Sequence, residues 1–261
     1  MTPSGLWLVN LGAALAAMGL LWLASLALRN ASIVDAWWGP GFALLAWLDV
    51  ALTGGHPRRL LLAALISLWG LRLGAYLLWR NHGKGEDFRY AAMRRRHGAR
   101  FPWVSLATVF ALQGVLLAVV SLPIALAMAR PGAPALGALD ALGAALFAVG
   151  FFFEALGDWQ LARFKADPAN AGRVMDRGLW AWTRHPNYFG DCCVWWGLYA
   201  IALASPLGWA GLPGPVAMTV LLLRVSGVAL LERTIARRRP AYADYAARVP
   251  AFFPRPPRRR P

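Results

Sequence analysis

Long apolar runs alternate with short polar segments along almost the whole chain. A transmembrane helix needs about 20 mostly apolar residues. Seven runs approach that length, and we predict a transmembrane helix for each, at residues 6–28, 33–52, 60–79, 104–128, 136–156, 188–205 and 212–231. The pattern therefore indicates an all-α integral membrane protein. We expect a single transmembrane domain over residues 1–261, in which residues 256–261 form a disordered basic tail.

The composition supports this fold class. The chain is 59% hydrophobic and 15% charged, whereas a soluble domain carries about 25% charged residues. The only two cysteines, Cys192 and Cys193, are adjacent, so they cannot join distant segments as a disulfide framework. The four histidines are scattered and match no metal-binding spacing, so we predict no metal site.

The basic residues that give the chain its net charge of +15 cluster in three polar segments. These are residues 80–100, residues 157–187 and the chain after residue 232, and with seven spans all three lie on one side of the membrane. The positive-inside rule places that side in the cytoplasm and the N-terminus outside. Because the charges flank apolar runs, we expect anionic membrane lipids and a phosphorylated ligand as partners, and no nucleic acid.

Several ionisable residues fall within or at the ends of the predicted spans, where they are energetically costly and are functional candidates. They are Asp35, Arg72, Glu154, Asp158, Asp191, Arg224 and Glu232. The alternative for each is a structural ion pair or an interfacial anchor. For Asp35 this would be a helix cap or an ion pair with Arg72, and for Asp49 an anchor at the outer interface.

The stretch RHPNYFGD combines a cation, an imidazole, an amide, a phenol and a carboxylate at the entrance to an apolar segment. Pro186 suits the first turn of a helix, which would place Asn187 and Asp191 one turn apart on one face. The free N–H groups of a helix start favour phosphate, and Arg184 just before it adds a planar cation. Tyr188 supplies a ring for stacking. These residues indicate a nucleotide-like ligand at a membrane surface, outside a Rossmann fold because no GxGxxG follows a strand.

Three blocks within residues 150–255 carry a resemblance to a known family. GLWAWTRHPNYFGD and the upstream DWQLARFKADP resemble segments of sterol reductases, and the late YADYAARVPAFFP resembles their C-terminal part. The length and the seven predicted spans are similar to the bacterial, uncharacterised branch of the steroid 5-alpha-reductase family, the DUF1295-like proteins. SIVDAWWG and GEDFRY match only that bacterial group.

The resemblance implies a membrane-embedded reductase that uses NADPH, in a bacterial inner membrane. It implies that Asn187 and Asp191 hold the nicotinamide half of the cofactor and that Lys165 binds phosphate. The full set of cofactor-binding residues that it implies is Asp158, Lys165, Arg184, Asn187, Tyr188, Asp191, Arg224, Glu232 and Tyr245.

The reaction that this resemblance implies is the reduction of a C=C bond in a hydrophobic small-molecule substrate. Asp35 is a candidate acid, with Tyr90 and Tyr188 as rivals. Glu86 lies in a loop with two alternative roles, which are to fold over the cofactor or to pair with nearby arginines. The pair of residues with which steroid 5-alpha-reductases polarise a ketone is not preserved. Steroid-like, isoprenoid, quinone and enone-lipid substrates therefore all stay open.

Two other classes of function fit parts of the sequence. RHPNY and a late glutamate, Glu232, also suit a membrane methyltransferase that uses S-adenosylmethionine, of the isoprenylcysteine carboxyl methyltransferase type. A small transporter or lipid-binding scaffold would need paired helix breaks, and WWGPG is the only such break. The sequence does not indicate the oligomeric state.

Overall fold

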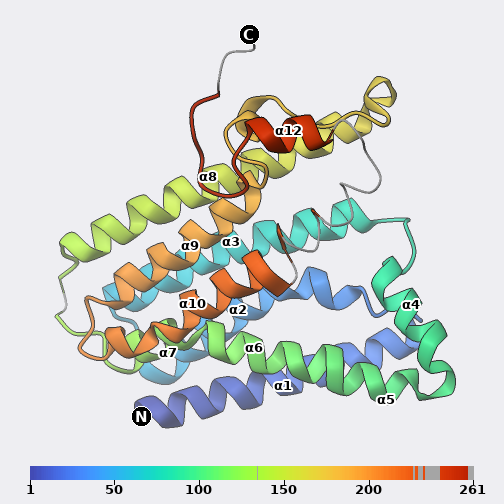
Figure 1. Cartoon of the computed structure of the whole chain (residues 1–261). Helices are drawn as coiled ribbons and strands as arrows, with labels where there is room; N and C mark the ends of the chain where they lie inside the picture. The colour runs from blue at the N-terminus through green and yellow to red at the C-terminus, as the bar shows by residue number, and fades with distance from the viewer. Residues whose placement is uncertain (134, 226, 229–231, 233–241, 258–261) are drawn as a thin grey trace. The chain divides into compact units, whose positions relative to one another are not determined.

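The computed structural model describes residues 1–133, 135–225, 227–228, 232 and 242–257 (Figure 1). Every regular element in this part of the chain is a helix, which confirms the predicted all-α class. The chain forms two compact units. Unit 1 contains residues Met1–Asp140 and Leu198–Gly214, and unit 2 contains Ala141–Gly197 and Pro215–Pro261. The expectation of a single transmembrane domain stays a prediction.

Unit 1 is built from the N-terminal helices. They are α1 (Pro3–Ala27), α2 (Ile33–Thr53), α3 (Pro57–Asn81), α4 (Phe88–His97), η1 (Gly98–Arg100), α5 (Phe101–Ser105), the π-helix η2 (Leu106–Ala111), α6 (Leu112–Val120), α7 (Leu122–Ala129) and η5 (Gly208–Gly211). Three helices pass from one unit into the other: α8 (Ala138–Ala166), α9 (Pro186–Ala202) and α10 (Pro213–Val220). Unit 2 adds η3 (Pro168–Asn170), η4 (Gly178–Ala181), the π-helix η6 (Leu221–Val225) and α12 (Tyr242–Arg248).

Five helical segments among the described residues are long and apolar enough to cross a membrane. They are Pro3–Ala27, Pro57–Asn81, Phe88–Val120, Ala138–Ala166 and Gly208–Val225. The chain is therefore a multi-pass helical membrane protein. The other two predicted spans correspond to the helices α2 and α9, and the count of seven stays a prediction. Part of the last predicted span, and residues 258–261 of the predicted tail, lie outside the described residues.

The fourth span differs from its predicted start at residue 104, because the helical segment already begins at Phe88. Asp87 causes the earlier start, since its carboxylate accepts a hydrogen bond from the Arg89 amide and caps α4. The basic residues 89–100 thus belong to a helix rather than to an open loop.

Many large apolar side chains on the spans are exposed, among them Leu20, Leu78 and Trp103. Outside a membrane such a surface would drive aggregation, and in a membrane it contacts the lipid tails. The membrane lipids are therefore direct partners of these helices.

Glycines allow α2 and α3 to approach closely in unit 1. A Cβ added to Gly39 would overlap the backbone of Gly70, and one added to Gly70 would overlap that of Gly39. One turn further along α3, a Cβ at Gly74 would lie 2.7 Å from the ring of Pro40. Small residues take this role in membrane helices because lipid offers little hydrophobic drive, so that helices associate by close backbone packing.

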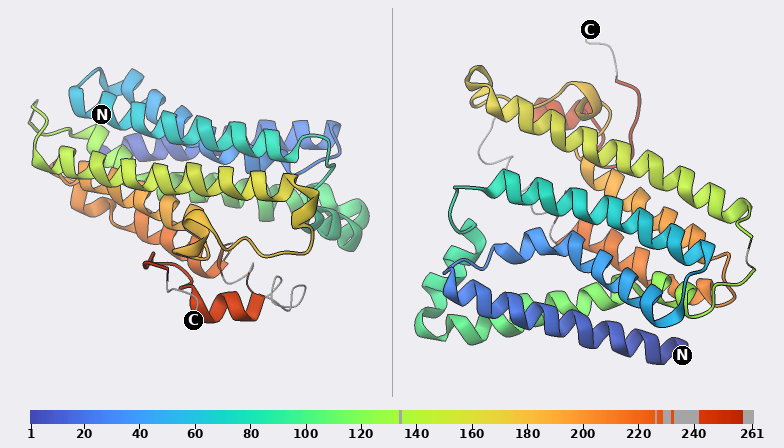
Figure 2. Two further views of the ribbon diagram at one scale, coloured as in Figure 1. Left: turned by 90° about the horizontal axis from the view of Figure 1, so that it is seen from above. Right: turned by 180° about the vertical axis from the view of Figure 1, so that it is seen from behind.

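The same device joins α8 and α9 within unit 2, which run alongside each other in both views of Figure 2. A Cβ at Gly150 would lie 2.5 Å from the carbonyl oxygen of Gly190, and one at Gly197 would lie 2.7 Å from the backbone of Phe147. At the other end of the contact, Gly157 of α8 faces Pro186 at the start of α9. This packing holds the polar start of α9 against α8.

Candidate functional site

The segment before α9 is held in place by α8 within unit 2. Gly178 has a positive φ of 60°, and the side chain of Gln160 fills the space where a Cβ would stand. The Gln160 amide oxygen accepts a hydrogen bond of 3.0 Å from the Leu179 backbone N–H. The buried indole of Trp180 donates to the carbonyl of Gly157 over 3.0 Å. The first two sequence blocks of the resemblance are thus joined by direct contacts.

The C-terminal segment is bonded to the same place. The Tyr245 hydroxyl donates to the Trp180 carbonyl over 2.6 Å, and Thr183 Oγ1 donates to the Phe252 carbonyl over 2.8 Å. Two backbone hydrogen bonds of 2.9 Å, from Arg184 to Pro250 and from Arg255 to Trp182, complete the contact. Three segments that lie far apart in the sequence therefore form one structure around the start of α9.

A bidentate ion pair between Arg184 and Glu232 lies at the centre of this structure. Arg184 Nε and Nη2 lie 2.8 and 3.0 Å from the two carboxylate oxygens of Glu232. The remaining nitrogen, Nη1, donates to the carbonyls of Ala246 and Val249 over 2.7 and 3.2 Å. A planar guanidinium can satisfy a carboxylate and two carbonyls at once, which a lysine cannot do.

Two further side chains lie within hydrogen-bond distance of the Glu232 carboxylate. Nε2 of the buried His185 lies 3.1 Å from Glu232 Oε1, and the Tyr242 hydroxyl lies 3.4 Å from the same oxygen. The hydrogen bond with His185 and the charge of Arg184 lower the pKa of Glu232, although partial burial acts in the opposite direction. Burial, together with the nearby Glu232 charge, raises the pKa of Tyr242 to about 12. At neutral pH Glu232 is therefore ionised and Tyr242 is a neutral donor.

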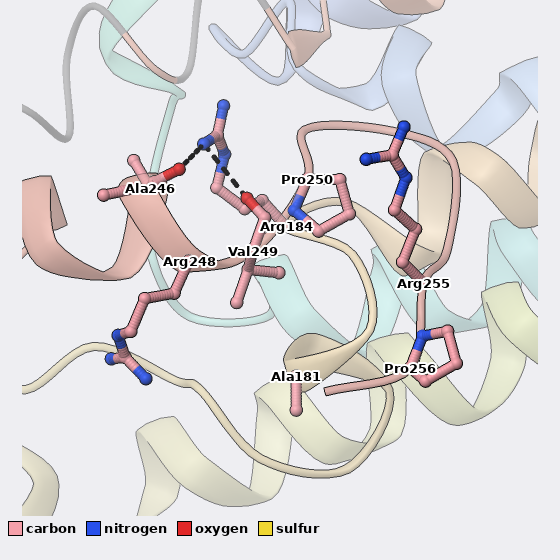
Figure 3. Close-up of a pocket in the computed structure, with 9 residues that line it drawn as sticks. Ala181, Arg184, Ala246, Arg248, Val249, Pro250, Arg255 and Pro256 are labelled. Atoms are coloured by element: carbon pink, nitrogen blue, oxygen red, sulfur yellow. Dashed lines mark hydrogen bonds between the residues drawn. The ribbon is translucent and has the colours of Figure 1, made fainter. Parts of the chain in front are cut away.

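A pocket of about 190 Å³ opens beside the ion pair (Figure 3). Its lining residues come from the stretch before α9, from α12 and from the chain that follows α12, and its only charged side chains are Arg184, Arg248 and Arg255. Glu232 compensates the charge of Arg184, whereas the ion pair of Arg248 with Asp176 is longer, at 3.9 Å, and Arg248 Nε donates to the Asp244 carbonyl over 3.2 Å. The Arg255 side chain is exposed. In Figure 3, Arg255 and Arg248 lie on opposite sides of Pro250. The pocket is therefore electropositive.

Asn187 and Asp158 form a second polar pair at the start of α9. The Asn187 amide nitrogen donates to Asp158 Oδ1 over 3.1 Å, and Asp158 is 5% exposed. The Asn187 amide oxygen accepts from the Tyr188 backbone N–H. The Tyr188 ring stacks on His185, with ring centroids 5.6 Å apart. Asp158 thus fixes the orientation of the Asn187 amide.

The other predicted cofactor-binding residues differ in how far they are buried. Tyr245 is buried under the C-terminal segment, where its hydroxyl bonds a carbonyl. Asp191 is partly buried one turn after Asn187, as the helix start at Pro186 predicts. Lys165 is exposed at the end of α8, and Arg224 is exposed on η6. The cofactor roles of all these residues stay predictions.

The predicted catalytic residues lie together in unit 1. Asp35 accepts a hydrogen bond of 2.7 Å from the Tyr90 hydroxyl on one oxygen and one of 2.7 Å from Arg89 on the other. The Tyr90 side chain is buried and Asp35 is partly exposed. Asp35 is therefore ion-paired with Arg89, and the alternative ion pair with Arg72 stays a prediction. Sequence separation concealed this contact, since Arg89 follows Asp35 by more than fifty residues.

Glu86 closes the loop before α4 onto the start of α2. Both of its oxygens bond Arg94, at 2.8 and 2.9 Å, and one of them also accepts from the Ala31 backbone N–H over 2.8 Å. The Arg94 guanidinium lowers the pKa of Glu86. In the structure Glu86 has the structural role given above as the alternative, and its catalytic role stays a prediction.

Several residues of the unit 2 site were missed by the sequence analysis. His185 lies inside RHPNYFGD, so its position was visible, but its partner Glu232 lies 47 residues away. Gln160 stands in the first motif block without an assigned role. Tyr242, Arg248 and Arg255 lie in the C-terminal stretch, where a high content of arginine made each single one inconspicuous.

The fold and the site together define a helical membrane protein whose RHPNYFGD stretch forms an electropositive surface with the C-terminal segment. The comparisons name its family. The family model described as "Protein of unknown function (DUF1295)" matches residues 21–249, so the chain belongs to this family. It is also similar to "Uncharacterized protein C594.04c" of Schizosaccharomyces pombe, with 28% identity over 90% of this chain and 76% of the relative. No solved structure matches the chain.

Proposed function

We propose that this protein is a membrane-embedded reductase that uses NADPH to reduce a C=C bond in a hydrophobic substrate. The observation that carries the proposal is the electropositive pocket that RHPNYFGD and the C-terminal segment build in unit 2. Two of the three steroid 5-alpha-reductase-like sequence blocks supply lining residues of this pocket, and the blocks resemble the cofactor-binding segments of that family.

The side chains at the pocket fit the anionic half of a dinucleotide. Arg248 and Arg255 carry the least compensated positive charges of the lining. Charge-assisted hydrogen bonds from arginine to phosphate are short and strong, and the planar fork matches two phosphate oxygens. Arg184 already makes four hydrogen bonds, two to Glu232 and two to carbonyls, so it shapes the pocket rather than contributing free charge.

Asn187 fits the nicotinamide half. Its amide is held by Asp158, so that a nearby carboxamide would meet an oriented donor and acceptor. Asp191, one turn later, adds an acceptor at the helix start. Bound NADPH supplies a hydride to one carbon of the double bond, and the other carbon takes a proton. The protein's tasks are then to position the two reactants and to exclude water.

Tyr90 is the proposed proton donor. Both oxygens of Asp35 accept hydrogen bonds, so the transferable proton of this cluster is on the Tyr90 hydroxyl. Asp35 then orients the Tyr90 hydroxyl, and the tyrosinate left after the transfer takes up a proton from water. This assignment rests on the chemistry of the side chains within unit 1, and it makes Tyr90 rather than Asp35 the acid.

The membrane arrangement is part of the same proposal. We propose seven spans, with α2 and α9 crossing in addition to the five long apolar segments, and with the N-terminus outside. The basic residues 80–100 and the pocket of unit 2 would then face the cytoplasm, where NADPH is found. A bacterial inner membrane suits this orientation, and a substrate dissolved in the lipid would be hydrophobic.

A binding titration separates this proposal from the methyltransferase alternative. The full chain, purified in detergent, is titrated with NADPH and with S-adenosylmethionine while tryptophan fluorescence is followed. We expect saturable quenching by NADPH alone, because S-adenosylmethionine carries a sulfonium cation and no phosphate for the arginines. Binding of S-adenosylmethionine alone would establish the methyltransferase, and binding of neither would remove both.

A matched pair of arginine variants locates the site. Arg255→Ala should weaken NADPH binding about 10- to 100-fold, the size of one lost charge-assisted hydrogen bond. Arg163→Ala removes an exposed arginine of the same unit, whose guanidinium lies over Trp159 on α8, away from the pocket lining. It should leave the affinity unchanged. Equal affinity in both variants would keep NADPH as a ligand but place its phosphates elsewhere.

A further inference from the structure

A pair of polar side chains that the proposed function does not use is enclosed inside unit 1. Asn10 of α1 is 0% exposed and Asp49 of α2 is 1% exposed. The Asn10 amide nitrogen donates to Asp49 Oδ2 over 3.1 Å. Asp49 is therefore not the interfacial anchor that the sequence suggested. The side chain is buried, and its hydrogen-bond partner is an uncharged amide.

The surroundings of the pair are apolar. On α1, the residues one turn before and one turn after Asn10 are Leu6 and Ala14, which are 0% and 2% exposed. On α2, Leu45 and Ala46 precede Asp49 by one turn and are 2% and 1% exposed. An ionised carboxylate is costly in such surroundings unless it is paired and fully hydrogen-bonded.

One side-chain oxygen of each residue in the pair lacks a hydrogen-bond donor in the part of the chain that the structure describes. Asn10 Oδ1 and Asp49 Oδ1 are both buried, and neither has a hydrogen-bond partner among the described residues. Two buried acceptors without a donor are rare in native proteins. A proton on Asp49 resolves both at once, because the acid O–H can donate to the amide oxygen while the amide N–H donates to the acid carbonyl.

We infer that Asp49 and Asn10 form a neutral carboxylic acid–amide pair, so that the folded chain keeps one bound proton inside unit 1. The two groups complete a cyclic pair of hydrogen bonds without any further partner. This proton site is independent of the cofactor pocket in unit 2 and of the Asp35 cluster. It also fixes α1 against α2, because a shifted register would leave both groups unsatisfied.

Most helices that pack against α1 carry no residue that could neutralise an ionised Asp49. The sequences of α1, η2, α6 and α7 contain no charged residue. The only other charged residue of α2, Asp35, precedes Asp49 by fourteen positions, which is about 21 Å along a helix.

The cations of α3 are all engaged elsewhere. The Arg58 guanidinium is paired with Asp140, and Arg59 Nε donates to the carbonyl of Met128. Further along, Arg72 and Arg80 lie over the ring of Tyr76. None of these helices therefore brings a described cation into an ion pair with Asp49, which favours the neutral acid.

Infrared spectroscopy of the purified full chain tests the inference directly. The difference spectrum of wild type minus Asp49→Asn at neutral pH should show the C=O stretch of a protonated carboxyl group, shifted downward in deuterated water. The Asn side chain preserves the shape and keeps an amide–amide pair, so the variant should fold. As a control, Asp244→Asn removes an exposed carboxylate of α12 and should remove only an ionised carboxylate band.

The pH dependence of stability gives a second readout. If the folded chain holds one more proton at Asp49 than the unfolded chain does, stability falls as pH rises. The melting temperature of wild type should therefore decrease from neutral to alkaline pH relative to that of Asp49→Asn, which cannot titrate there. Parallel curves for the two proteins, or loss of an ionised carboxylate band in Asp49→Asn, would overturn the inference. Stabilisation of wild type alone by sodium ions would likewise overturn it, in favour of a bound cation.

Discussion

Two arginine–carboxylate pairs with the same geometry serve different purposes in the two units. In unit 1, Arg58 Nε and Nη2 lie 2.7 and 2.8 Å from the oxygens of Asp140, and the two side chains are 3% and 2% exposed. In unit 2, Arg184 Nε and Nη2 lie 2.8 and 3.0 Å from the oxygens of Glu232, and these side chains are 12% and 27% exposed. The chemistry is shared, and the access to solvent differs.

The difference lies in what surrounds each fork. Arg58 also donates to the carbonyls of Pro131, Ala133 and Ala135, so that the whole guanidinium is enclosed and the chain before α8 is fixed to the start of α3. Arg184 has two carbonyl acceptors as well, but its pair borders an open pocket. A fully enclosed ion pair acts as a structural clamp, whereas a half-open one can shape a ligand site.

The largest effect is expected from breaking the enclosed pair. Arg58→Leu leaves Asp140 buried without its counter-charge, which should lower the free energy of unfolding by about 3–5 kcal/mol. Arg184→Leu should lower it by less, because Glu232 keeps contact with water. Thermal unfolding in detergent measures both. Partial recovery in Arg58→Leu/Asp140→Leu would show that the stranded charge is the cause, and equal losses in the two single variants would contradict the comparison.

The second prediction concerns the binding function of unit 2 and rests on the proposed NADPH site. Asn187→Ala removes the amide that Asp158 orients, and it should weaken NADPH binding about 10- to 100-fold with little loss of stability. Asn170→Ala is the matched control, because the Asn170 amide bonds only Asp167 and the Phe164 carbonyl among the described residues. Unchanged affinity in Asn187→Ala would remove this residue from the site.

The smallest effect is the acid sensitivity of the half-open pair. The folded-state pKa of Glu232 lies below its ordinary value of 4.5. The stabilisation from this group is therefore present above pH 4.5 and is lost as the pH falls through the lower folded value. Because water screens the pair, the loss should be on the order of 1 kcal/mol. Glu232→Gln should abolish that part of the acid dependence. A wild-type curve that matches Glu232→Gln throughout would show that the pair contributes nothing.

Much of the fold followed from local rules. Apolar runs of sufficient length predict helices because their backbone groups must be satisfied internally in lipid. Pro186 predicted the start of α9, which the structure confirms. The start of the fourth span was predicted too late along the chain. The basic residues before the apolar run lower its hydropathy, although Asp87 caps a helix that already includes them. Charged residues lower the mean hydropathy of a segment, but they do not prevent it from forming a helix.

The partners of the polar residues were less accessible. The sequence singled out Asp35, Tyr90 and Glu86, yet it could not show that Asp35 binds Tyr90 and Arg89 or that Glu86 binds Arg94. It also identified Arg184 and Glu232 as candidates without showing that they form an ion pair. Such contacts depend on how helices pack across many residues of separation.

By itself, then, the sequence determined that this chain is a helical membrane protein, where most of its helices run and which polar residues are costly enough to matter. Those properties depend on local composition and on the period of one helix. Only the tertiary structure decided which charge neutralises which, that the arginine of RHPNYFGD faces Glu232 beside a pocket, and that Asp49 is buried against Asn10. These outcomes depend on which faces of different helices pack together, as the close glycine contacts of α2 with α3 illustrate, and that is a property of pairs of helices rather than of any one segment.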